Sequence, residues 1–266
     1  MQPANSPSPQ SALPAAIEIA LVVLIVTAFA AGFLPVSEVP ALLILGWVSL
    51  RRRGLRWASV GLRRPENGRR AVLLTAAGVA YAIISLYTLD PLLDRLTGHP
   101  ADLSEFADVR GNPSMLAFWL LVSWLLGAFG EEMAYRGYII NRISDLLPHR
   151  AAAPSIAILG SGLLFGVSHI SQGLSGVISN FLGGLVCGIL YVLAGWNLWV
   201  PPAGPWSGGH HWVRPDFFGA VSRSVARPET CAARLRSRAH EAHECPLGCD
   251  NTARWVERPR SAERHR

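Results

Sequence analysis

Two adjacent glutamates, an arginine and a histidine stand out because they lie inside apolar stretches of the sequence. Glu131 and Glu132 directly follow the apolar run 115–130, Arg136 lies four residues after Glu132, and His169 ends the apolar run 155–169. Ionisable side chains are costly inside a membrane, and where they occur they usually mark a functional site. Carboxylates and an imidazole are the groups that perform general acid–base catalysis or hold a metal-bound water.

A purely structural explanation covers only part of this group. Glu132 and Arg136 are spaced to form an ion pair on one face of a helix. Glu131 lies about 100° further round the same helix, so that pair accounts for only one of the two glutamates. A lone histidine is more often a packing residue than a ligand, but the spacing favours a shared site. Glu131 and His169 each lie 19 residues from Arg150, the centre of a proline-flanked turn, so an antiparallel helix pair brings them to one depth.

Six apolar segments are available to position these residues. They are 15–34, 36–50, 71–87, 115–130, 155–169 and 174–198. Half of the 266 residues are hydrophobic and only 16% are charged, whereas about a quarter of a soluble domain is charged. We therefore predict an all-α, polytopic helical membrane protein with about six membrane segments. We expect 115–147 to form one helix that contains both glutamates, and Asn180 to face the same interior.

The arginines predict an orientation. All 24 basic residues are arginine, and eight of them crowd the stretch 51–70, whereas 90–112 carries five acidic residues and two arginines. The positive-inside rule places 51–70 and the N-terminus in the cytoplasm, which predicts a multi-pass protein of the plasma membrane. Residues 1–14 carry no positive charge, so 15–34 is expected to be a retained span and not a signal peptide. The net charge of +6 does not indicate a nucleic-acid partner, because the arginines follow no periodic face.

Glu131-Glu132-x-x-x-Arg136 on one expected helix, followed by Phe165-x-x-x-His169 on the next, resembles the CAAX-protease and bacteriocin-processing (CPBP, or Abi) family of intramembrane metalloproteases. The resemblance spans roughly residues 40–201 and includes the stretch 195–201. It implies a bacterial membrane endopeptidase that cleaves membrane-associated peptide or protein substrates near the cytoplasmic side. Glu131 would activate a water with His169 as its partner, and Glu132 would assist or pair with Arg136, which orients the site. The family name implies a divalent metal such as zinc, although two glutamates and a histidine can equally activate water without one.

The third motif of the family, a histidine followed four residues later by Asn or Asp, is missing after Pro201. Pro202 and Pro205 would break a helix at that place. Removing one base from the codons of Pro201 and Pro202 permits a reading with His and Asp at the family's spacing. We therefore expect a low-order N-terminus at 1–14, a truncated protease domain at 15–201, and an arginine-rich tail at 202–266 that is a shifted-frame translation.

A genuine tail is the alternative to a shifted frame. It would contain zinc-type ligands at His240, His243, Cys245 and Cys249, although their spacing is not a standard one. Three functions stay open at this point. The first is the endopeptidase, inactive as the sequence stands if the third motif is essential. The second is a non-enzymatic immunity or scaffolding protein of the same fold. The third is a transporter that uses Glu131 and Glu132 as ion sites, against which the sequence shows no paired inverted halves.

Overall fold

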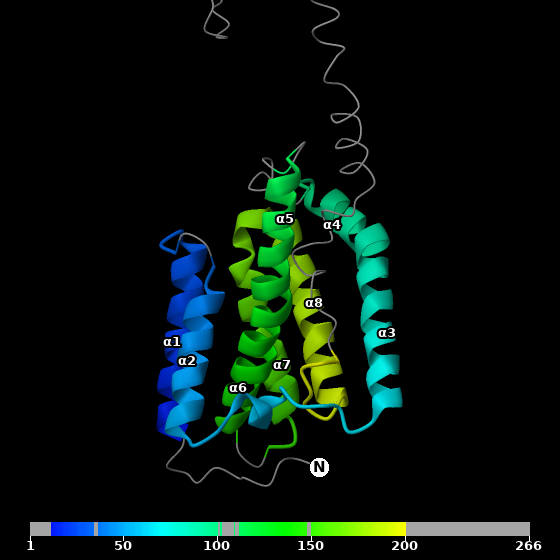
Figure 1. Cartoon of the computed structure of the whole chain (residues 1–266). Coiled ribbons are helices and arrows are strands. Elements are labelled where there is room, and N and C mark those ends of the chain that lie inside the picture. The colour runs from blue at the N-terminus through cyan, green and yellow to red at the C-terminus, as the bar shows by residue number, and fades with distance from the viewer. Residues whose placement is uncertain are drawn as a thin grey trace, which may run out of the picture. The chain divides into compact units, whose positions relative to one another are not determined.

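The computed structural model describes residues 12–34, 37–100, 102, 109, 112–147 and 150–200, and every regular element among them is helical. This confirms the all-α prediction (Figure 1). The α-helices are α1 (Ala12–Ala30), α2 (Val39–Arg52), α3 (Gly68–Ile84), α4 (Asp90–Thr97), α5 (Pro113–Val122), α6 (Asn141–Asp145), α7 (Ala153–Ser168) and α8 (Gly173–Leu193). Short 3₁₀ turns form η2 (Trp57–Val60) and η7 (Ile170–Gln172), and π-helical turns form η3 (Ser85–Leu89), η5 (Ser123–Gly130) and η6 (Glu132–Ile140). The predicted tail, 202–266, lies outside the described residues.

Each of the six predicted membrane segments corresponds to a helix. Four helical runs are long and apolar enough to cross a membrane, namely Leu13–Ala30, Gly68–Thr97, Pro113–Asp145 and Ile170–Leu193. The other two are shorter, with 16 residues in α7 and 14 in α2. The chain is therefore a helical membrane protein, as its composition indicates.

The 33-residue run Pro113–Asp145 is continuous through α5, η5, η6 and α6, so both glutamates lie within one helix, as predicted. Its start is capped by Asn112, whose side chain accepts a hydrogen bond from the Met115 amide at 3.2 Å. Near its middle the backbone widens, and the Glu131 amide donates to the carbonyl of Leu126, five residues back. Such π-turns occur frequently at functional sites.

One segment extends further than the hydropathy pattern predicts. The helix that begins at Gly68 continues to Thr97, so Asp90 and Asp94 belong to it and not to a loop. Two serines of α8 provide hydrogen bonds to these carboxylates. Ser179 donates to Asp90 at 2.6 Å, and Ser175 donates to Asp94 at 2.7 Å. The acidic stretch 90–112 is therefore helical over residues 90–97.

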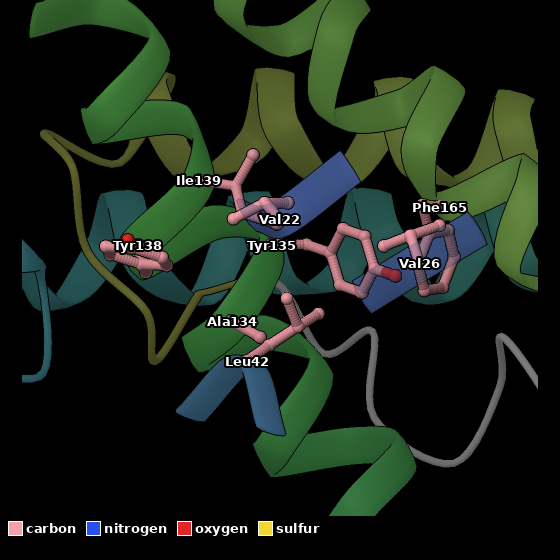
Figure 2. Close-up of a cluster of buried hydrophobic side chains, with 8 residues drawn as sticks. All are labelled: Val22, Val26, Leu42, Ala134, Tyr135, Tyr138, Ile139 and Phe165. Carbon is pink, nitrogen blue, oxygen red and sulfur yellow. The ribbon is translucent and has the colours of Figure 1, made fainter. Parts of the chain in front are cut away.

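A hydrophobic core forms where α1, α2, η6 and α7 meet. Its buried members are Val22, Val26, Leu42, Ala134, Tyr135, Tyr138, Ile139 and Phe165 (Figure 2). In Figure 1, α1 and α2 stand at one edge of the helices, α3 stands at the other, and α5, α7 and α8 lie between them. The helices α7 and α8 approach closely because glycines meet, and a Cβ on Gly184 would lie 3.1 Å from the Cα of Gly162.

A network of charged side chains joins three helices at the arginine-rich end. Glu18 of α1 accepts hydrogen bonds from Ser49 at 2.6 Å, from Tyr138 at 2.9 Å and from Arg142 at 2.6 Å. Arg142 and Arg53 both contact Asp145 at 2.9 Å. The end of α2 and the end of the long helix therefore lie together, which gathers basic groups at one end of the molecule. That this end is cytoplasmic stays a prediction.

Candidate functional site

The long helix carries a buried ion pair at its centre. Arg136 Nη1 lies 3.2 Å from Glu132 Oε1, and the two side chains are only 1% and 7% exposed. The guanidinium of Arg136 also lies over the ring of Phe165, with its Cζ 4.6 Å from the ring centroid. The predicted ion pair between Glu132 and Arg136 is thus present. Arg136 also contacts Phe165, the first residue of the Phe165-x-x-x-His169 motif.

His169 lies directly after the end of α7 and contacts the same phenyl ring. The ring centroids of Phe165 and His169 are 4.8 Å apart, and those of Tyr135 and Phe165 are 5.0 Å apart. The Nδ1 of His169 lies 2.9 Å from the carbonyl oxygen of Phe165. Because a carbonyl only accepts, Nδ1 carries the proton in the neutral ring and the lone pair of Nε2 is available. The imidazole is therefore oriented for proton transfer or for hydrogen bonding through Nε2.

Arg136 and His169 both contact Phe165, and Glu132 joins this group through its ion pair with Arg136. Glu131 is half-buried and occupies the junction between η5 and η6, next to this group in the chain. Asn180 is buried, and its amide donates to Gln172 Oε1 at 3.0 Å and to the Gly176 carbonyl at 2.8 Å. It therefore supports the turn that follows His169. That it faces the same interior as the glutamates stays a prediction.

A second buried carboxylate, Glu38, was missed by the sequence analysis as a site residue. The hydroxyl of Tyr135 donates to Glu38 Oε1 at 2.7 Å, and the two residues are 0% and 4% exposed. Tyr135 lies between the glutamates and Arg136 in the chain, so Glu38 adds an acidic group to this side of the helix. The available signal was a glutamate beside Pro40 within an apolar segment.

Three polar atoms at this site have no hydrogen-bond partner among the described residues. They are Glu132 Oε2 and both terminal nitrogens of Arg136, Nη1 and Nη2; the 3.2 Å contact of Nη1 with Glu132 Oε1 is an ion pair without hydrogen-bond geometry. Buried polar atoms are normally paired, and where they are not, a functional role is one explanation. An acceptor such as a peptide carbonyl would satisfy the arginine donors.

The described residues do not by themselves fit a metal centre. No group of three or more His, Cys, Asp and Glu side chains is arranged to hold a metal ion within the part of the chain that the structure describes. The histidines and cysteines of the tail, 240–249, lie outside that part. Among the described residues, this site therefore provides no set of three or more ligands for the predicted zinc ion.

The buried ion pair thus lies on a helix that is long and apolar enough to cross a membrane. Residues 113–203 match the family model described as type II CAAX prenyl endopeptidase Rce1-like. The match covers about a third of the chain and includes Glu131, Glu132, Arg136 and His169. Over this segment, the chain is similar to the CAAX-protease (CPBP) family that its motifs resemble. No curated protein and no solved structure matches it.

Proposed function

We propose that this protein is an intramembrane endopeptidase that hydrolyses peptide bonds of membrane-associated substrates. The observation that carries the proposal is the contact of Phe165 with both Arg136 and His169, which joins the two motifs at one buried place. The matched family is described as a CAAX prenyl endopeptidase, so a peptide with a prenylated cysteine near its C-terminus is the substrate class proposed here.

In the proposed reaction, Glu131 accepts a proton from a water molecule whose oxygen attacks the carbonyl carbon of the scissile bond. His169 positions this water through Nε2, which the Nδ1 contact with Phe165 leaves available. The terminal nitrogens of Arg136 are aligned by Glu132 and offer hydrogen bonds to the carbonyl oxygen as negative charge develops on it. The C–N bond then breaks, and the proton passes to the leaving amine. None of these steps requires a metal.

The proposal also includes an explanation for the missing third motif of the family. We propose that residues 202–266 arise from a single-base insertion in the codons of Pro201 and Pro202, and that the uninterrupted gene encodes a further span with His and Asp. Resequencing of codons 195–215 from source DNA tests this directly. Loss of one base would support the proposal, and an unchanged sequence would overturn it.

The catalytic proposal is tested with the chain as it stands and with a frame-restored chain, both in proteoliposomes with a farnesylated fluorogenic peptide. We expect Glu131→Gln and His169→Ala to lower the cleavage rate by about 10²–10⁴-fold, the usual contribution of a general acid or base. Glu66→Gln is the matched control, because its side chain is 81% exposed and lies away from the site.

Full cleavage by Glu131→Gln would reject the catalytic role of Glu131, and no cleavage by either the chain as it stands or the frame-restored chain would favour the non-enzymatic alternative. Cleavage by the restored chain alone would show that the third motif is essential. Activity that is lost with a chelator and regained with Zn²⁺ would add a metal to the mechanism, and indifference to the chelator would support water activation by side chains alone.

A further inference from the structure

A basic cavity and an apolar groove lie next to each other along α2. The cavity has a volume of about 410 Å³, and its lining includes Leu50, Arg51, Leu55 and Arg56. The groove has a volume of about 380 Å³ and is lined by Leu43, Ile44, Trp47, Trp57, Phe129 and Met133. Trp47 and Trp57 line both spaces, so the two are adjacent. We call the two together the α2 wall.

The helical period of α2 produces this change from apolar to basic. Leu43, Trp47 and Arg51 follow one another at intervals of four residues, so they share one face. The guanidinium of Arg51 lies over Trp47, 5.4 Å from the ring centroid. An indole at this boundary and an arginine beyond it are arranged as at a membrane–water interface.

The opposite side of the cavity is held by the packing of Trp57 against α2. A Cβ on Gly46 would lie 3.1 Å from Cη2 of Trp57, so the glycine allows this close contact. On the groove side, Met133 is only 8% exposed, whereas Ile44 is 65% exposed and faces outward. The groove is therefore exposed on the side of Ile44 and is bounded by the buried Met133 of the long helix.

From these features we propose that the α2 wall binds one anionic phospholipid. Arg51 and Arg56 hold the phosphate of the headgroup, and one acyl chain lies in the groove between Trp47 and Phe129. The argument is charge complementarity, because the lining of the cavity contains two arginines and no acidic residue. An amphiphile matches the adjacent basic and apolar parts better than a free anion does. This site is separate from the proposed catalytic residues and stands whether or not the chain cleaves peptides.

The test measures lipid binding to the purified full chain by native mass spectrometry, with dioleoyl phosphatidylglycerol and dioleoyl phosphatidylcholine as probes. The variant Arg51→Gln/Arg56→Gln is compared with Arg64→Gln/Arg69→Gln, which removes the same charge from the same arginine-rich stretch outside the cavity. We expect the cavity variant to bind phosphatidylglycerol at least about fivefold more weakly than the control variant, since a single basic residue near the surface contributes about that factor.

Equal weakening in both variants would overturn the site and leave only general attraction to the basic stretch. Equal binding of the two lipids by the unmodified chain would overturn the role of the headgroup charge. Protection by inorganic phosphate against thermal unfolding, as large as that by phosphatidylglycerol, would show a free-anion site and reject the lipid. Trp47→Ala tests the shared wall, and we expect it to weaken phosphatidylglycerol binding while the cleavage rate is unchanged.

Discussion

Arg136 is the side chain on which the candidate site depends. It faces Glu132 on its own helix and the Phe165 ring on α7, and only 1% of its surface is exposed. Removing a charge from water is costly, and a buried pair repays that cost only when both partners are present. The stability of the site is therefore sensitive to the loss of either charge, and less sensitive to the loss of both.

This predicts a specific pattern in a double-mutant cycle. Glu132→Gln leaves Arg136 charged beside a neutral amide and should lower the free energy of unfolding by about 3–5 kcal/mol, the usual cost of breaking a buried pair. In the double variant Glu132→Gln/Arg136→Met, the methionine fills most of the space of the arginine side chain and leaves no unpaired charge. This variant should therefore be more stable than Glu132→Gln alone. Thermal unfolding in detergent measures all four forms. Additive losses would contradict the coupling of the two residues.

At the level of residues, the sequence predicts those that carry charge into apolar surroundings. Glu131, Glu132, Arg136 and His169 are predicted in this way, because an ionisable residue inside a span is visible without a structure. Glu38 was not recognised as part of the site, since its importance comes from the contact with Tyr135, 97 residues away. A tertiary hydrogen bond of that kind leaves no periodic signal in one sequence.

At the scale of elements, the apolar segments predicted all six helices but not where each one ends. The helix from Gly68 extends through Asp90 because Ser179, 89 residues away on α8, donates to this aspartate. A hydropathy pattern records the charge and not its partner, so it ends the segment too early. The start of α2 depends likewise on a contact between helices, because Val39 packs against Gly130.

The contact between Val39 and Gly130 gives the second prediction. A Cβ on Gly130 would lie 2.7 Å from Cγ1 of Val39, so Gly130→Ala should lower the free energy of unfolding by about 1–3 kcal/mol through overpacking. Val39→Ala should restore part of this loss by removing the clashing methyl group. Gly127→Ala is the matched control in the same π-helical segment, because nothing lies within 4 Å of its added Cβ. If both alanine variants unfold alike, close helix approach is not what requires glycine at residue 130.

At the scale of the whole molecule, one charged network links the first helix to the rest. The carboxylate of Glu18 on α1 accepts from Ser49 on α2 and from Tyr138 and Arg142 on the long helix. The basic end of the molecule is thereby tied together by a side chain from a membrane span. Polar contacts of this kind hold helices in lipid, where apolar burial contributes little to association between them.

The third prediction follows from the difference between this network and a surface pair. Glu18 is 17% exposed in its ion pair with Arg142, whereas Glu66, which pairs with Arg63, is 81% exposed. Glu18→Gln should lower the free energy of unfolding by more than about 2 kcal/mol, because Arg142 then loses its buried carboxylate. Glu66→Gln should change it by less than about 1 kcal/mol, as exposed pairs do.

Thermal unfolding of the full chain in detergent measures this difference, and limited proteolysis between residues 53 and 67 reports whether the basic end has loosened. We expect faster cleavage in this stretch for Glu18→Gln, because Ser49 and Arg53 belong to the end of α2 that the network holds. Equal unfolding temperatures for Glu18→Gln and Glu66→Gln would mean that apolar packing of Val22 and Val26 alone secures α1. A loss confined to Glu18→Gln would show that the first span is anchored through charge at the same end that carries the arginines.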